Sequence, residues 1–324
     1  MHLLVCGGAG YVGSHVAKVL YARGHRVTVL DNLSTGHREA VRWGPLIQAD
    51  ILDTASLDAA FQGRHYDAVL HFCARSLVGE SMVAPYDYYE NNVVGTLNLL
   101  QAMRRHDVER IVFSSTAAVF GNPVSSLIDE DHPKAPINPY GASKLIVERI
   151  LADAAHAYGL RSVCLRYFNA AGASAEDGIG ECHEPETHLI PNLLRALINP
   201  AAPLKVFGQD YPTPDGTCVR DYVHVLDLAD AHVRALEHME RTPGAHAFNL
   251  GNGTGFSVLQ VIQAAEQVTG HRVLFEAAPR RAGDPPVLVA SSQRARDVLG
   301  WSPTYTGIAD ILRTAWDWHR APAF

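Results

Sequence analysis

The chain has 324 residues, of which 47% are hydrophobic and 19% charged, and its formal net charge is -7 at pH 7. This composition suits a globular protein with one large or two unequal domains, and the negative charge without any Lys/Arg run argues against a nucleic-acid partner. No apolar stretch approaches the ~20 residues of a membrane span, and the first apolar run is too short for a signal peptide. Five irregularly spaced cysteines do not suggest a disulfide framework, so we expect a cytoplasmic protein.

The first half of the chain alternates short apolar runs with helical patterns, which predicts an α/β fold with a Rossmann-like, doubly wound parallel sheet. The continuous apolar runs indicate strands that are buried on both faces. The expected strands are 2–6, 26–30, 46–49, 68–72, 110–113 and 162–165. The expected helices are 11–23, 88–104 and 140–158.

A glycine-rich turn follows the first expected strand. Gly7, Gly8, Gly10 and Gly13 have the spacing of dinucleotide-binding turns, where glycines allow a tight turn and bring a pyrophosphate close to a helix N-terminus. Asp31, at the end of the second strand, would accept from ribose hydroxyls and repel a 2′-phosphate. The turn therefore predicts a dinucleotide site, and Asp31 favours NAD over NADP.

Two further strand ends carry candidate cofactor contacts. Asp50 follows the third strand and either caps the helix that begins near Asp53 or reaches the adenine. The run 71–74 ends the fourth strand at the carboxyl edge, where such sheets bind ligands. We expect its small residues to let the chain pass close to the cofactor, and His71 to be a satisfied strand histidine rather than a catalyst.

The pair Tyr140 and Lys144 is the chemical core of the sequence. Residues four apart share one face of a helix, and an ammonium near a phenol favours the phenolate, lowering its pKa from ~10 toward neutral pH. The run Ser114-Ser115-Thr116 closes the fifth strand on the ligand-binding edge. We expect Thr116 to bond the reacting oxygen, with Ser114 and Ser115 in support. Together with the dinucleotide turn, these residues predict redox chemistry at a carbinol carbon.

The pattern changes after Asn169. Residues 172–185 and 208–216 are rich in Gly, Pro and acidic or small residues, which is typical of loops or lids. We therefore predict an NAD-binding domain in residues 1–170, rejoined by part of 218–250, and a smaller α+β substrate-binding domain in residues 171–324. His183 and His188 lack a recognised metal-ligand spacing, so no metal site is expected.

Several motifs resemble the extended short-chain dehydrogenase/reductases, and those of the second half resemble the UDP-glucose 4-epimerase family within them. The resemblance spans essentially the whole chain, and its second-half motifs are the more specific ones. First-half motifs include 7–13, 30–32, 71–72, 88–96, 113–116, 140–144 and 166–169. Second-half motifs are 189–191, 207–217, 219–229, 249–251 and 280–284.

The resemblance implies an enzyme that keeps NAD bound and interconverts UDP-galactose and UDP-glucose. Tyr140 would remove the 4′-hydroxyl proton while hydride leaves C4′, and the 4-keto sugar would turn before hydride returns to its other face. Lys144 would bond the nicotinamide ribose and lower the pKa of Tyr140, while Thr116 would hold the reacting hydroxyl. A homodimer through 88–104 and the 140–158 helix is also implied.

The resemblance and the strand-end positions together give two sets of contacts. The cofactor contacts are Gly7, Gly10, Tyr11, Val12, Gly13, Asp31, Asn32, Asp50, Ile51, Phe72, Cys73, Ala74, Asn91, Ser114, Tyr140, Lys144 and Tyr167. The UDP-sugar contacts are Thr116, Tyr140, Asn169, His188, Leu189, Phe207, Arg220, Arg281, Asp284 and Leu288.

Three positions depart from the pattern of many relatives. Ser76 stands where many have a lysine that contacts the cofactor, and Arg75 is the candidate replacement. His188 stands where some have an asparagine that contacts the substrate diphosphate. Leu288 stands where some have a tyrosine that closes the sugar pocket against an N-acetyl group, so we expect N-acetylated substrates beside UDP-galactose.

Other functions compete with this interpretation. A 4,6-dehydratase of nucleotide sugars needs an acid pair just after the strand-end hydroxyl, where Ala117 and Ala118 stand. A 4-epimerase of UDP-N-acetylhexosamines, UDP-pentoses or UDP-uronates stays open, because the sequence does not resolve recognition at C5′. A non-catalytic NAD-binding sensor or scaffold would have little reason to carry Thr116, Tyr140 and Lys144 together.

Overall fold

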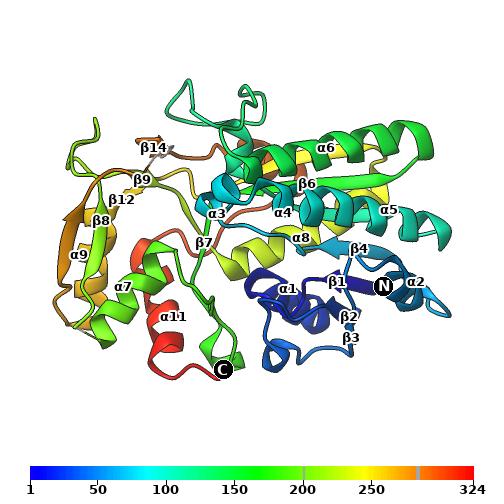
Figure 1. Ribbon diagram of the computed structural model, residues 1–324, viewed down its shortest axis with the longest axis horizontal. Helices are drawn as coiled ribbons and strands as arrows, with labels where there is room; N and C mark the ends of the chain where they lie inside the picture. The colour runs from blue at the N-terminus through cyan, green and yellow to red at the C-terminus, as the bar shows by residue number, and fades with distance from the viewer. Residues whose placement is uncertain (200, 282–284) are drawn as a thin grey trace.

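The computed structural model describes residues 1–199, 201–281 and 285–324. A parallel sheet forms the larger part of the molecule, in the strand order β11-β6-β5-β4-β1-β2-β3 (Figure 1). Its strands are β1 (His2–Cys6), β2 (Arg26–Asp31), β3 (Leu46–Gln48), β4 (Ala68–His71), β5 (Arg110–Thr116), β6 (Arg161–Tyr167) and β11 (Ala245–Leu250). This confirms the predicted α/β fold with a doubly wound parallel sheet.

Helices cover both faces of the sheet. Leu3 and Val5 point into one apolar cluster and Leu4 and Cys6 into the other, which explains why the strands appear as continuous apolar runs. On the first face pack α1 (Tyr11–Ala22) and α8 (Val225–Arg241), and on the second pack α2 (Thr54–Phe61), α5 (Gly95–Arg105) and α6 (Pro139–Tyr158).

The strand order reverses between β1 and β4. From β1 the chain builds outward through β2 and β3, and then starts again on the other side with β4 and β5. In open α/β sheets the crevice at such a reversal, at the carboxyl ends of the strands, is where ligands bind. The topology therefore places the glycine turn after β1 and the end of β4 side by side.

The predicted helix 88–104 is interrupted. The structure has α3 (Val78–Val83) and α4 (Pro85–Tyr89), then a π-helical segment η2 (Glu90–Val94) that leads into α5. The predicted helix 140–158 is confirmed as α6, which begins one residue earlier because Pro139 takes its first position. The Asn138 side chain caps it by accepting from the Gly141 N–H at 2.8 Å.

A smaller region packs beside the sheet, and in Figure 1 it occupies the left side. Its own apolar core lies among α7 (Leu189–Ile198), α9 (Val258–Thr269) and α11 (Ile308–Arg320). Its short strands are β7 (Asn169–Ala171), β8 (Leu204–Phe207), β9 (Val219–Arg220), β10 (Tyr222–His224), β12 (Phe256–Ser257), β13 (Phe275–Ala278) and β14 (Val287–Leu288). The remaining elements are α10 (Gln293–Leu299) and the 3₁₀ turns η1 (Arg38–Ala40), η3 (Ala117–Phe120) and η4 (Ala175–Asp177). Among the described helices, none combines the length and apolar character that a membrane crossing needs.

The chain passes between the two regions more than once. After β10, helix α8 returns to the first face of the sheet and β11 pairs in parallel with β6. Asp221 is fully buried at this crossing, and its carboxylate accepts from the backbone N–H groups of Asn252 (2.8 Å), Gly253 (3.1 Å) and Ala290 (3.1 Å). Burial raises the pKa of Asp221 to about 6. One side chain thus joins β9, the segment after β11 and the segment after β14.

Candidate active site

The turn between β1 and α1 has no room for a side chain at Gly7, Gly8 or Gly13. Gly7 has φ +80°, and a Cβ there would lie 2.8 Å from the Cys73 backbone nitrogen. A Cβ on Gly13 would lie 2.2 Å from the Gly7 carbonyl oxygen. Gly10 precedes the first turn of α1, where Tyr11 and Val12 present backbone N–H groups at the positive end of the helix. This cradle fits the pyrophosphate of a dinucleotide.

Asp31 is held at the end of β2 by two backbone donors. Its carboxylate accepts from the Ala9 N–H at 3.0 Å and from the Leu33 N–H at 2.8 Å, and only 6% of the residue is exposed. Burial raises the pKa of Asp31, and the two backbone donors oppose that rise. Because each carboxylate oxygen has two lone pairs, both oxygens retain capacity for ribose hydroxyls.

Asp50 and Asn32 lie together at the neighbouring strand ends. The Asn32 side-chain amide donates to Asp50 Oδ2 at 2.9 Å, and both residues line one hollow at this edge of the sheet. Helix α2 is capped by Asp53, which accepts from the Ala55 N–H, so the alternative in which Asp50 caps that helix is wrong. Ile51 is a core residue with 3% exposure, which leaves only its backbone for a cofactor contact.

The end of β4 passes directly under the glycine turn. The backbone of Phe72 and Cys73 lies so close to Gly7 that an added Cβ would be 2.8 Å from each of them. Ala74 follows directly in the chain. His71 is buried beside this segment, its Nε2 lies 2.8 Å from Thr96 Oγ1, and burial lowers its pKa to about 3. Because the Thr96 hydroxyl donates to the Asn92 carbonyl, the neutral ring donates from Nε2. His71 is therefore a buried strand histidine, but the prediction that it is satisfied holds only at Nε2, because Nδ1 makes no hydrogen bond among the described residues.

Thr116, Tyr140 and Lys144 come together where β5 ends and α6 begins. The Thr116 hydroxyl bonds the phenol of Tyr140 and also accepts from the Ala118 N–H at 3.1 Å, which caps η3. Lys144 is 2% exposed, and its Nζ donates to the Ser114 carbonyl at 2.7 Å. The structure thus brings together the three residues predicted to be catalytic.

The electrostatics of this group differ from the prediction. Burial raises the pKa of Tyr140, although the bond from Thr116 opposes the rise. Burial also lowers the pKa of Lys144 to about 7. The expected lowering of the Tyr140 pKa by Lys144 is therefore wrong for this structure, because desolvation of the phenol dominates and the amine points to the Ser114 carbonyl.

The two serines that precede Thr116 point in opposite directions. The Ser114 hydroxyl pairs with the Tyr167 hydroxyl from β6, near the site. The Ser115 hydroxyl instead donates to Glu148 at 2.6 Å, and Glu148 forms a buried two-pronged ion pair with Arg166. Ser115 thus supports the packing of α6 on β6 and does not face the ligand edge.

Asn91 lies in the π-helical segment next to a residue that the sequence did not single out. Its side-chain amide donates to Asn92 Oδ1 at 3.0 Å. The buried Asn92 holds the backbone of Arg75, at both its N–H and its carbonyl, and donates to Ser143. The Arg75 guanidinium lies 3.3 Å from Glu80. In the sequence, only the adjacent pair Asn91-Asn92 pointed to these hydrogen bonds from Asn92 to Arg75 and Ser143.

Apart from Thr116 and Tyr140, the predicted UDP-sugar contacts that the structure describes lie in the smaller region. Asn169 begins β7, and its N–H donates to the Asp221 carbonyl at 3.0 Å. The Arg220 guanidinium donates to the Val219 and Pro285 carbonyls, each at 2.9 Å. Leu288 pairs in register with Arg220 and packs against the cluster at Phe120.

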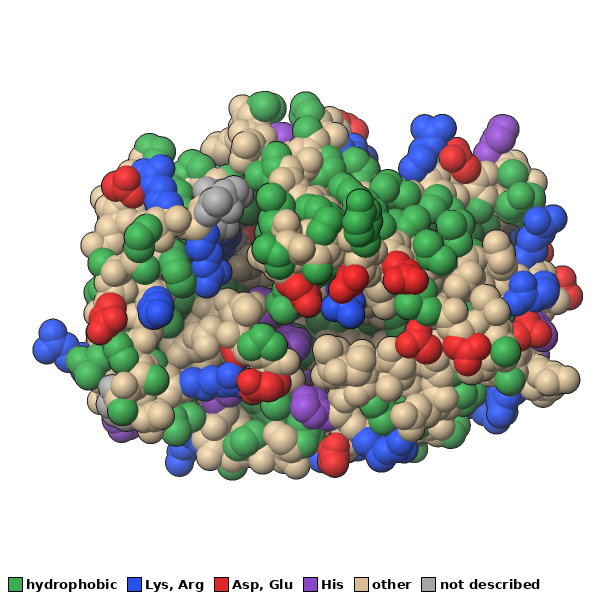
Figure 2. Space-filling view, viewed as in Figure 1, with side chains coloured by type: hydrophobic (Ala, Val, Ile, Leu, Met, Phe, Trp, Pro, Cys, Tyr) green, Lys and Arg blue, Asp and Glu red, His purple; other side chains and the backbone are tan. Residues whose placement is uncertain are grey.

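Two more of these contacts form a pair, the exposed Arg281 and the half-buried Phe207. The Arg281 guanidinium lies 4.1 Å from the centre of the Phe207 ring. Asp284, the remaining predicted contact of this segment, lies outside the described residues. In the view of Figure 2 the surface is hollowed between the part that carries α9 and the part that carries α6.

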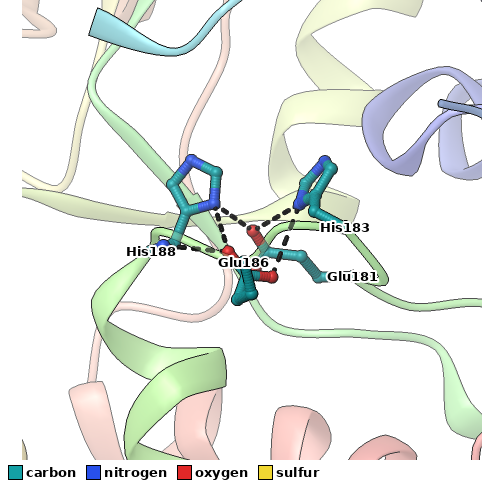
Figure 3. A group of neighbouring side chains, drawn as sticks. All are labelled: Glu181, His183, Glu186 and His188. Atoms are coloured by element: carbon teal, nitrogen blue, oxygen red, sulfur yellow. Dashed lines mark hydrogen bonds and ion pairs between the residues drawn. The ribbon is translucent and has the colours of Figure 1, made fainter. Parts of the chain in front are cut away.

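His188 precedes Leu189, the first residue of α7, and lies in a cluster of histidines and glutamates. Its Nδ1 is 2.8 Å from Glu186 and 2.9 Å from Glu181 (Figure 3). Burial lowers its pKa, but the bonds to the two carboxylates outweigh burial and raise it to about 10. The same balance raises the pKa of His183 to about 9. Glu181 and Glu186 could not be recognised as partners from the sequence, because the loop brings the four residues together.

Known proteins resemble the chain over nearly its full length. Residues 3–251 match the NAD dependent epimerase/dehydratase family. The UDP-glucose 4-epimerase of Halalkalibacterium halodurans is 51% identical over 320 residues, which are 99% of this chain and 96% of the relative.

Solved structures agree with that match. The UDP-glucose 4-epimerase from Brucella ovis in complex with NAD is 49% identical, with 97% of each chain covered and a TM-score of 0.94. The UDP-glucose-4-epimerase from Stenotrophomonas maltophila with bound NAD and formylated UDP-arabinopyranose is 42% identical, with 99% and 98% covered and a TM-score of 0.95.

Proposed function

Because the chain belongs to the NAD dependent epimerase/dehydratase family, we propose that it is a UDP-glucose 4-epimerase in which Tyr140, Thr116 and Lys144 carry out the reaction. The enzyme uses NAD and interconverts UDP-galactose and UDP-glucose by oxidising C4′ to a ketone and reducing it again from the other face. The observation that carries this proposal is the bond between the buried Thr116 and the half-buried Tyr140 at the sheet edge that holds the glycine turn.

The residues at the sheet edge that carries the glycine turn fit NAD, and we assign each of them to one group of that cofactor. The first turn of α1, after Gly10, would hold the pyrophosphate, Asp31 the ribose hydroxyls, and the segment 72–74 would pass along the nicotinamide half. When bound there, NAD would supply the acceptor and donor of the C4′ hydride. The hollow at Asn32 and Asp50 would receive the adenine end.

Proton transfer falls to Tyr140. Its phenol takes the proton of the 4′-hydroxyl and later returns one to the 4′-oxygen, while Thr116 holds that oxygen in place. Lys144, one helical turn along α6, is a positioning residue whose amine, held at the Ser114 carbonyl, would bond the nicotinamide ribose. The buried surroundings exclude water from the 4-keto sugar.

UDP recognition falls to the smaller region. The planar guanidinium groups of Arg220 and Arg281 suit a diphosphate, because their paired donors match phosphate oxygens. Phe207 offers a ring beside Arg281 for the uracil, and Asn169, His188 and Leu189 border the same side. Residues 171–324, apart from the part of 218–250 that joins the sheet, then form the substrate-binding domain.

We expect a homodimer in the cytoplasm. Helices α3 and α4, η2 and α6 pack together and expose apolar side chains, with Val83 83% and Tyr86 86% exposed and Val94 and Ile146 less so. A second copy would cover this patch, and light scattering at several concentrations measures the mass. The five cysteines are free thiols, which suits a reducing compartment.

The decisive experiment incubates the purified protein with UDP-galactose without added NAD and separates the products by chromatography. Appearance of UDP-glucose establishes both the reaction and retained cofactor. Tyr140→Phe should fold and retain NAD but turn over about 10²–10⁴-fold more slowly. If nothing converts even after NAD is added, the galactose assignment fails, and UDP-pentoses and UDP-uronates are tested next.

Leu288 motivates a second substrate. Its side chain packs against the apolar cluster that contains Phe120, the last residue of η3. A leucine at this position fills less of the proposed sugar pocket than a tyrosine would. UDP-N-acetylgalactosamine is therefore expected to turn over, and Leu288→Tyr should suppress that reaction more than the reaction of UDP-galactose. If the wild-type protein leaves UDP-N-acetylgalactosamine untouched, this extension is wrong.

A further inference from the structure

The loop before α7 gathers four metal-ligating side chains, of which only His188 is also a proposed substrate contact. Glu181, His183, Glu186 and His188 point toward one another, and one ligand atom from each lies within 4.8 Å of the others (Figure 3). The two carboxylates are buried, with side-chain exposures of 6% for Glu181 and 0% for Glu186. Two imidazoles and two carboxylates therefore share one small volume, which is buried on the side of the carboxylates and reaches the surface at His188.

The spacing of these atoms is close to that of a tetrahedral metal site. His188 Nδ1 lies 2.9 Å from Glu181 Oε1 and 2.8 Å from Glu186 Oε1. His183 Nδ1 lies 3.3 Å from Glu181 Oε1 and 3.6 Å from Glu186 Oε2. A tetrahedral ion with bonds of ~2.0–2.2 Å keeps its ligands roughly 3.3–3.6 Å apart, so small side-chain movements would complete the geometry.

One carboxylate oxygen is left over in this cluster. Glu186 Oε1 accepts from the backbone N–H groups of Thr187 (2.7 Å) and His188 (2.8 Å). Glu186 Oε2 is buried and makes no hydrogen bond among the described residues, and neither does His183 Nδ1, whose contacts with Glu181 (3.3 Å) and Glu186 (3.6 Å) are ion pairs. Buried polar atoms are rarely left without partners, so the pair marks a place for a missing cation.

We propose that Glu181, His183, Glu186 and His188 bind one divalent transition-metal ion, for which Zn²⁺ is the best match. Imidazole nitrogen and carboxylate oxygen are ordinary Zn²⁺ ligands, and the two carboxylates neutralise its charge. Two nitrogen ligands out of four disfavour Mg²⁺ and Ca²⁺, which prefer oxygen.

The ion would fasten three elements together. The Glu181 carbonyl accepts from the Trp318 indole N–H of α11, and His188 begins α7. The His183 ring lies edge-on to Tyr11 of α1 at 6.3 Å, and the Tyr11 hydroxyl donates to the Gly172 carbonyl at the start of the loop. The ion therefore has a structural role: it holds the loop against the glycine turn and the beginning of the substrate-binding helix.

The test uses the purified protein with its retained cofactor, treated with a chelator and then titrated with Co²⁺. We expect one Co²⁺ per chain with the intense visible bands of tetrahedral coordination, displaced by one equivalent of Zn²⁺ and not by Mg²⁺. Glu186→Gln and His183→Asn should each weaken Co²⁺ binding about tenfold or more. Zn²⁺ should also raise the unfolding temperature of the wild-type protein and not that of the variants.

Matched controls separate this site from other histidines. His246, whose ring lies 4.8 Å from that of His238, belongs to another close histidine pair, and His246→Asn should leave the spectrum unchanged. Absence of tetrahedral bands, or bands that survive His183→Asn, would overturn the proposal. His183 is partly exposed, so its variant remains informative if Glu186→Gln does not fold. The titration reads the ion directly, and its outcome does not depend on whether UDP-galactose is the substrate.

Discussion

The hydroxyl of Thr116 has two partners, and they predict how its substitutions behave. Thr116→Ala loses the bond to Tyr140, and a bond to a charged group is worth about 1.5–3 kcal/mol, so kcat should fall by about tenfold to a hundredfold. It also loses the cap of η3, at about 1 kcal/mol of stability. Thr116→Ser keeps both bonds and should keep most of the rate and the unfolding temperature. If the serine variant is as slow as the alanine variant, the hydroxyl is not what matters.

Lys144 makes the stability of the protein depend on pH. Burial lowers the pKa of Lys144 in the folded state to about 7, below the unfolded value of 10.5. The contribution of Lys144 to stability is therefore fully present above about pH 10.5, where the amine is neutral in both states. That contribution is lost as the pH falls through 7. Methionine does not titrate. Lys144→Met should therefore gain stability relative to the wild type from about pH 10 down to pH 7, with little change below.

Thermal unfolding at pH 6.5 and at pH 9.5 measures this gain. We expect the advantage of Lys144→Met in unfolding temperature to be larger at pH 6.5 by about 2 °C or more, while its epimerase activity is lost at both pH values. An equal difference at the two pH values would show that the lysine is not buried as an amine.

At this scale the sequence predicted which residues meet but not their electrostatic state. Strand-end and helix-face positions follow from local periodicity, so Thr116, Tyr140 and Lys144 could be placed together. The direction of a pKa shift depends on burial and on where Lys144 points, and both are set by distant parts of the chain. The same reason hid the role of Ser115, because Glu148 and Arg166 meet it only in the folded sheet.

The turn between β1 and α1 should tolerate an added methyl group poorly. Gly13→Ala places a Cβ 2.2 Å from the Gly7 carbonyl, which forces the turn apart and should abolish NAD retention. Gly79→Ala is the matched control, because its Cβ would meet nothing within 4 Å, and it should unfold at or slightly above the wild-type temperature. The ratio of bound NAD to protein, read by absorbance, checks both. Retained NAD in Gly13→Ala would mean that the turn is not the cofactor cradle.

Among the elements, long helices and apolar strands were predictable, and the π-helical segment was not. The sequence predicted one continuous helix over 88–104 from its period, and the structure inserts η2 between α4 and α5. The wider turn lets Asn92 reach the backbone of Arg75 and the Ser143 hydroxyl, which belong to other elements. Hydrophobic periodicity in a local window cannot predict hydrogen bonds to residues that are distant in the sequence.

At the scale of the whole molecule, Asp221 is where stability should be most sensitive. Asp221→Asn keeps the size but replaces one accepting oxygen by an amide that faces backbone donors, so the free energy of unfolding should fall by about 1–3 kcal/mol. Asp317→Asn, on the exposed side of α11, is the control and should change little. Equal unfolding curves for the two variants would show that Asp221 does not join the regions.

The overall architecture was predictable only in part. Alternating strands and helices predicted the parallel sheet, and the change of pattern after Asn169 predicted a second region. The short strands β7, β9, β10, β12 and β14 were not predicted individually, since two or three residues carry no periodicity. The division into domains stays a prediction.

The pairing of β11 with β6 also has a consequence for folding during synthesis on the ribosome. Strand β6 ends at Tyr167, and its partner begins at Ala245, about 78 residues later. At 5–20 residues per second, the nascent sheet would wait roughly 4–16 s with one open edge and without α8 over its first face. A nascent chain stalled before residue 245 should therefore bind a holdase chaperone, and one stalled well beyond residue 250 should not.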